Sequence, residues 1–137
     1  MILLDTHILL WLVEGDNRLG RQVRARIATE AAAENVVVST ISFWEIGLLI
    51  EKNRIALSMP LGDFAEVVTR RGDIKVVPVD TGIAVGTASL PPGLHGDPGD
   101  RMLVATARHL VCPLATTDGK ILTYAAQGHL QAIDARH

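Results

Sequence analysis

The sequence has little that would place the chain in a membrane or in an oxidising compartment. Cys112 is the only cysteine, so no disulfide can form within the chain, which fits a reducing cytoplasm. No stretch approaches the roughly 18 uncharged apolar residues that a membrane span requires. The apolar N-terminus has no basic start and carries Asp5 and His7 inside its run, which argues against a signal peptide. We therefore expect a cytoplasmic protein that makes no membrane contact.

The chain also lacks a large excess of charge of either sign and the common nucleotide-binding motifs. The formal net charge is −2, so no overall basic field points to a nucleic acid or to an anionic membrane surface. The chain has no P-loop, no GxGxxG loop and no GxSxG turn, which removes support for nucleotide and serine-hydrolase sites. The five histidines are scattered, and none forms a zinc-spaced cluster with the cysteine. Acidic residues remain as the main candidates for chemistry.

Short apolar runs alternate along the chain with longer segments of helical periodicity. With 137 residues, 48% of them hydrophobic, we expect a single domain over residues 1–137. The alternation predicts an α/β fold, a three-layer α/β/α sandwich with a central, mostly parallel sheet of about five strands. The expected strands are 1–5, 35–40, 73–80, 113–118 and 130–135, and the expected helices are 7–14, 18–33, 41–53, 60–71, 80–89, 99–111 and 119–126.

Three acidic residues follow strands of the predicted sheet. Asp5 ends the first strand, which we place at the centre of the sheet; Glu45 lies in the apolar helix after the second; and Asp118 ends the fourth. Each has a plain structural explanation as a helix cap, a turn residue or one polar position on an amphipathic helix. Their shared location matters more, because ligands of open α/β sheets bind beyond the carboxyl ends of the strands.

The segment "HGDPGDRM" holds two more aspartates, and their positions separate their roles. If Asp97 is the N-cap of the following helix, Pro98 occupies the first helical position, where its missing N–H costs nothing. Asp100 then lies one turn in, and one cap accounts for only one of the two aspartates. We expect Asp97 to be structural and Asp100 to be free to face the strand ends.

Four carboxylates converging on one rim predict a metal site. Such groups repel one another and raise one another's pKa values, a cost that a divalent cation removes. Ligand sets made only of oxygen favour Mg²⁺ or Mn²⁺, and such sites suit hydrolysis of phosphodiesters by a metal-activated water. His7 and His95 lie close enough to the rim to be minor candidates. The four acids are Asp5, Glu45, Asp100 and Asp118. If all four are committed to one site, the rest of the chain carries a net charge of +2.

The motifs that carry these acids resemble those of PIN-domain ribonucleases, most closely the VapC-type toxins of prokaryotic toxin–antitoxin pairs. They are, in order, "MILLDTHILLWL", "STISFWEIG", "LPPGLHGDPGDRMLVATA" and "LATTDGKILTY", and the resemblance spans nearly the whole chain. It implies a Mg²⁺- or Mn²⁺-dependent endoribonuclease that forms a homodimer and is held inactive by an antitoxin protein. The residues that carry over as catalytic and metal-binding are Asp5, Glu45, Asp100 and Asp118, with the hydroxyls of Thr6 and Thr117 beside them.

Two positions depart from the family pattern. Gly99 stands where the motif commonly has a bulky phenylalanine, which we expect to loosen the loop ahead of Asp100, and Leu49 stands where a lysine is common, which removes a phosphate contact. For RNA binding, Arg101 is the best-placed cation, directly after Asp100. We interpret the arginines at 18, 21, 24 and 26 as a solvated helix face, and Trp11 and Trp44 as core or dimer packing.

Two other functions remain open at this point. One is a phospho-acceptor domain of the receiver type, because strand three ends in Asp80, although the acidic pair after strand one and the lysine after strand five are missing. The other is a catalytically idle binding module whose acids serve only a protein partner.

Overall fold

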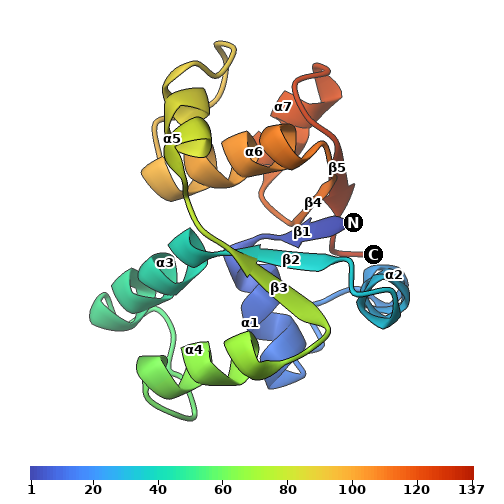
Figure 1. Ribbon diagram of the computed structural model, residues 1–137, viewed down its shortest axis with the longest axis vertical. Helices are drawn as coiled ribbons and strands as arrows, with labels where there is room; N and C mark the ends of the chain where they lie inside the picture. Colours follow the sequence, from blue (N-terminus) through green and yellow to red (C-terminus); the bar gives the residue numbers. More distant parts are fainter.

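The central sheet is parallel, so the carboxyl ends of all its strands lie at one edge. In the computed structural model, which describes residues 1–137, five strands pair in the order β3-β2-β1-β4-β5, and every pairing is parallel (Figure 1). The predicted, mostly parallel sheet is confirmed, and β1 lies at its centre as expected. Pro78 follows the edge strand β3, where the missing N–H breaks no ladder. The strands are β1 (Ile2–Leu4), β2 (Val36–Ser39), β3 (Ile74–Val77), β4 (Leu114–Thr116) and β5 (Ala132–Asp134).

Helices cover both faces of the sheet, which confirms the three-layer α/β/α architecture (Figure 1). Successive strand residues point to opposite faces, so Ile2 and Leu4 join one buried cluster with α1 to α4, and Leu3 joins another with α6 and α7. The helices are α1 (Thr6–Glu14), α2 (Arg21–Ala32), α3 (Thr40–Glu51), α4 (Leu61–Arg70), α5 (Thr81–Ala88), α6 (Pro98–Leu110) and α7 (Gly119–Ala126). None of them combines the length and the apolar composition needed to cross a membrane.

The start of α2 differs from the prediction. The helix begins at Arg21, not at residue 18, because the buried Gly20 is its N-cap and is pressed against the C-terminal residue. A Cβ atom on Gly20 would lie 2.0 Å from the carbonyl carbon of His137, a position that only glycine can occupy. Arg18 is therefore not part of the helix face that we had assigned to it.

Side-chain caps cluster at the carboxyl-end rim of the sheet. Helix α3 begins directly after a strand, and α1, α5 and α7 each begin a few residues after one. Each of these helices has an oxygen-bearing N-cap that accepts a backbone N–H of the first turn. The first turns, with their unpaired N–H groups, are thereby fixed around one rim. The capping residues are Asp5, Ser39, Asp80 and Asp118.

Candidate functional site

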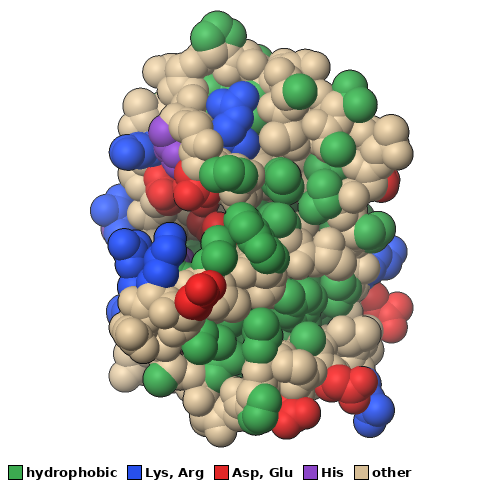
Figure 2. Space-filling model, turned by 90° about the vertical axis from the view of Figure 1, so that its left-hand side faces the viewer, with side chains coloured by type: hydrophobic (Ala, Val, Ile, Leu, Met, Phe, Trp, Pro, Cys, Tyr) green, Lys and Arg blue, Asp and Glu red, His purple; other side chains and the backbone are tan.

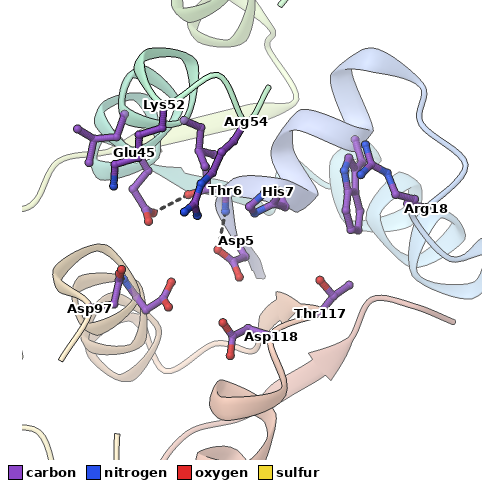
Figure 3. Close-up of a pocket in the computed structure, with 14 residues that line it drawn as sticks. Asp5, Thr6, His7, Arg18, Glu45, Lys52, Arg54, Asp97, Thr117 and Asp118 are labelled. Atoms are coloured by element: carbon purple, nitrogen blue, oxygen red, sulfur yellow. Dashed lines mark hydrogen bonds between the residues drawn. The ribbon is translucent and has the colours of Figure 1, made fainter. Parts of the chain in front are cut away.

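The four acidic residues predicted from the sequence meet in one cavity at the rim. Its volume is about 520 Å³. Figure 3 shows the labelled carboxylates of Asp5, Glu45, Asp97 and Asp118 around this space, from α3 and from the residues just before α1, α6 and α7. Figure 2 shows acidic side chains gathered in a hollow with cationic groups beside it. The lining residues that concern the chemistry are Asp5, Glu45, Asp97, Asp100, Asp118, Thr6, Thr117, Arg18, Lys52 and Arg54.

Asp5 is the most buried of the acids, 8% exposed. Its Oδ1 accepts the backbone N–H of Thr6 at 2.7 Å and so caps α1, while its Oδ2 accepts the hydroxyl of Thr116 at 2.5 Å. Burial raises the pKa of Asp5, and the two hydrogen bonds oppose that rise only in part. We had not singled out Thr116, because its role follows from the register that pairs Leu4 with Ala115.

Glu45 approaches the cavity from α3 and is held by a hydroxyl. Thr6 lies within hydrogen-bond distance of two groups, the Glu45 carboxylate at 2.7 Å and the buried Ser42 hydroxyl at 3.0 Å. Burial, with a contribution from the negative charge of Asp5, raises the pKa of Glu45 to about 7, although the Thr6 hydrogen bond lowers it. The Thr6 hydroxyl, which we expected beside the acids, thus contacts the Glu45 carboxylate.

The two aspartates of "HGDPGD" are placed as the sequence predicted. Asp97 is the N-cap of α6, its Oδ1 accepts the N–H of Asp100 at 2.9 Å, and Pro98 occupies the first turn. Asp100 lies one turn in, with 18% of its side chain exposed. Burial, together with the negative charges of Asp5, Asp97, Glu45 and Asp118, raises the pKa of Asp100 to about 8.

Asp118 is both a cap and a lining residue. Its Oδ1 accepts the N–H groups of Lys120 and Ile121, at 2.8 and 3.1 Å, and so begins α7. The side chain also lines the cavity, together with the predicted Thr117. The structural and functional interpretations of Asp118 are therefore compatible, because capping uses one carboxylate oxygen and leaves the other.

The acids are close enough to share a cation. Ligand atoms of Glu45, Asp97 and Asp100 lie within 4.8 Å of one another, and so do those of His95, Asp100 and Asp118. Asp100 is common to both groups, and Asp5 lines the same cavity. The pKa values of Glu45 and Asp100 are raised to about 7 and about 8. A hard divalent cation bound here would offset the repulsion between these closely spaced carboxylates.

We expected Gly99 to loosen the loop ahead of Asp100, but the structure shows close packing at this position. A Cβ atom at this position would lie 2.3 Å from Oε2 of Glu45 and 2.4 Å from its carboxyl carbon. The Glu45 carboxylate thus occupies the space that a side chain at position 99 would fill. The glycine lets Glu45 pack onto the first turn of α6, beside Asp100.

Cationic residues flank the acids, but they differ from those we emphasised. Lys52 and Arg54, at the end of α3 and just beyond it, line the cavity and form no ion pair. Arg18 also lines it; its guanidinium carbon lies 5.0 Å from the centre of the Trp11 ring, and the side chain is paired with Asp16. The interpretation of Arg18 as part of a solvated helix face is therefore wrong.

The remaining predicted residues are placed as follows. Arg101 is not among the lining residues; its guanidinium donates to the carbonyl oxygens of Leu94, His95 and Thr87 and so holds the loop before α6. Trp11 packs against the larger core cluster, as expected, whereas Trp44 is 51% exposed, so it is not a core residue.

The chain is similar to known proteins in sequence and in fold. Over 123 residues the chain is 30% identical to Ribonuclease VapC22 of Mycobacterium tuberculosis (strain ATCC 25618 / H37Rv), covering 90% of this chain and 91% of that protein. FitAcB from Neisseria gonorrhoeae superimposes with a TM-score of 0.67 at 20% identity, covering 100% and 99% of the two chains. DNA-bound VapBC from Salmonella typhimurium gives 0.65 at 19% identity, covering 96% of each.

A model of the PIN domain matches residues 2–127, which include every acid of the cavity. The match to the family model and the identity to a curated relative over nine-tenths of the chain agree with the resemblance seen in the motifs. This protein belongs to the PIN domain family.

Proposed function

We propose that the protein is a divalent-cation-dependent endoribonuclease that acts as the toxin of a toxin–antitoxin pair. The observation that carries this proposal is the convergence of Asp5, Glu45, Asp100 and Asp118 in one cavity with raised pKa values for three of them. The similarity to Ribonuclease VapC22 supports RNA as the substrate. An oxygen-only donor set favours Mg²⁺ or Mn²⁺.

In this proposal the acidic residues bind the cation, and two threonines orient the acidic side chains. Asp5 and Asp100 face the cavity from β1–α1 and α6 and are the first candidates to hold the cation, with Glu45 and Asp118 completing the site. Thr116 and Thr6 fix the orientation of Asp5 and Glu45 by the hydrogen bonds described above. A bound Mg²⁺ or Mn²⁺ would supply Lewis acidity toward a phosphate oxygen and lower the pKa of a neighbouring water.

The proposal includes protein partners. The similar solved structures include FitAcB, DNA-bound VapBC and a toxin–antitoxin complex, which supports an antitoxin as the partner of this chain. We further propose that two copies of the chain associate. Large apolar side chains at the surface of α3 and α5 support this, since Trp44 is 51% and Val85 62% exposed.

The receiver-type alternative loses its main support. Asp80, the candidate acceptor, accepts the N–H of Ile83 at 2.9 Å as the cap of α5, and it is not among the residues that line the acidic cavity. An idle binding module would need no raised carboxyl pKa values. The nuclease proposal explains why the acids are kept together at such electrostatic cost.

The direct test is cleavage of single-stranded RNA by the purified chain with Mg²⁺ or Mn²⁺ and with EDTA. We expect cleavage with either cation and none with the chelator, because in this proposal the cation activates the attacking water. Cleavage that is equal in EDTA would contradict the proposal, as would no cleavage of any RNA under conditions in which the cation binds.

A second prediction concerns RNA binding by the unpaired cations. Replacing Lys52 or Arg54 with alanine should weaken RNA binding and lower the slope of log affinity against log salt by about 0.7 for each lost phosphate contact. The measurement is fluorescence anisotropy at several salt concentrations, in an Asp5→Asn background that leaves the RNA uncut. Arg26→Ala, at an exposed position on α2 outside the cavity, is the matched control. Equal slopes for all three variants would exclude Lys52 and Arg54 as phosphate contacts.

A further inference from the structure

His95 closes a ring of contacts with the two aspartates of its own loop. Its Nδ1 accepts the backbone N–H of Asp97 at 3.2 Å, and its Nε2 lies 3.2 Å from Oδ2 of Asp100. Asp97 in turn accepts the N–H of Asp100 through its carboxylate. The ring ties the imidazole to Asp100, the carboxyl that is common to both groups of closely spaced ligand atoms.

The contact at Nδ1 decides which ring nitrogen carries the hydrogen. Because the lone pair of Nδ1 accepts from Asp97, the hydrogen of the neutral imidazole is on Nε2. This atom is buried and its N–H is not aligned with any acceptor, although Oδ2 of Asp100 is within reach.

Two other roles for Nε2 fit the structure less well. A metal ligand needs a lone pair on Nε2, which would move the hydrogen to Nδ1, where the N–H of Asp97 already points. A contact with substrate needs an exposed atom, and Nε2 is shielded from solvent. Donation to Asp100 is the role that satisfies both nitrogens.

The loop that carries His95 is itself fixed. The guanidinium of Arg101 donates to the carbonyl oxygens of Leu94 and His95, at 3.3 and 3.4 Å, and to that of Thr87 at 3.4 Å. Arg101 therefore anchors the backbone on which the imidazole is mounted. Because its backbone is fixed, the His95 imidazole can in turn fix the orientation of the Asp100 carboxylate.

We propose that His95 is a positioning residue for Asp100, whose Nε2–H holds one oxygen of the carboxylate so that the other stays free for the divalent cation. This inference rests on the proposed metal-dependent function. Partners of this kind orient a metal ligand, and their loss typically lowers metal affinity about 10- to 100-fold.

The test compares three substitutions that separate the two ring nitrogens. His95→Gln places an amide N–H at the position of Nε2, His95→Asn places an amide oxygen at the position of Nδ1, and His95→Ala removes both. Mn²⁺ affinity is measured by isothermal titration calorimetry on the full chain. His109→Gln, at an exposed position on α6, is the matched control.

We expect His95→Ala and His95→Asn to bind Mn²⁺ about 10-fold or more weakly than the wild type, and His95→Gln to stay within about threefold of it. The control should match the wild type. Equal affinity in all variants, or an equal loss in Gln, Asn and Ala, would overturn the role of the Nε2 donor. A wild-type chain that binds no Mn²⁺ would instead overturn the proposed function and, with it, this role.

Discussion

Replacing Asp5 with asparagine is expected to lower the rate of RNA cleavage by about 10³-fold or more, corresponding to about 4 kcal/mol of transition-state stabilisation. Asparagine is as good an N-cap as aspartate, and its amide can still face the Thr6 N–H and the Thr116 hydroxyl. The substitution therefore removes a negative ligand while it keeps the local structure. The measurement is the single-turnover rate with saturating Mn²⁺, with circular dichroism as the check on folding.

The matched control for this variant is Asp80→Asn. Asp80 also caps a helix that begins near the carboxyl end of a strand, but it does not line the cavity. We expect the control to cleave RNA at the wild-type rate. An Asp5→Asn protein that is folded and retains more than about a tenth of the activity would be incompatible with Asp5 as a ligand of the cation.

The second large effect is on stability in the absence of metal. The pKa values of Asp100 and Glu45 are raised from 3.8 and 4.5 to about 8 and about 7, so the folded chain binds more protons than the unfolded chain between these limits. The free energy of unfolding must then fall as pH rises through this range. We expect the metal-free protein to be most stable, as far as these groups are concerned, below about pH 4 and to lose that contribution by about pH 8.

Thermal unfolding in EDTA between pH 5 and pH 8 checks this expectation. We expect Tm to fall by several degrees across the range and saturating Mn²⁺ to restore it at the alkaline end, because the cation binds only the folded state. Asp100→Asn, which cannot ionise at this position, should flatten the profile and unfold at a higher Tm than the wild type at pH 8 in EDTA. A wild-type Tm that rises with pH, or an unchanged slope in Asp100→Asn, would contradict the raised pKa values.

Much of the fold follows from patterns that a sequence exposes directly. The strands alternate between two buried clusters, so the apolar runs at 1–5 and 35–40 could be assigned, and capping residues marked most helix starts. The exception at α2 has a tertiary cause. Gly20 begins that helix because the C-terminal residue packs against it, a contact 117 positions away that no local pattern reveals.

The site was predictable to the extent that it depends on strand ends. The order of the strands brings Asp5 and Asp118 to the rim, and the position of Pro98 predicted Asp97 as the N-cap of α6 with Asp100 one turn in. Thr116 could not be found in this way, because its contact with Asp5 depends on the register of two neighbouring strands. The fit of Glu45 over Gly99 depends on the packing of α3 against α6.

The cationic side of the cavity was the least predictable part. Lys52 and Arg54 stand at the end of an apolar helix, and their spacing alone does not distinguish a functional surface from a solvated helix end. One cue was available: position 49 lacks the lysine common in the family, and Lys52 follows it by three residues, on nearly the same helix face. The salt dependence of RNA affinity in the Lys52→Ala and Arg54→Ala variants tests whether these cations contact phosphates.

The central claim is that the clustered acids hold a divalent cation, and it is tested most directly by calorimetric titration of the metal-free protein with Mn²⁺ at pH 7 in two buffers of different ionisation enthalpy. The account predicts that Mn²⁺ binds and that protons are released, because Asp100 and Glu45 carry protons near this pH when no metal is present. It also predicts that Asp5→Asn abolishes or greatly weakens the binding. No binding to the wild type, or binding without release of protons, would contradict it.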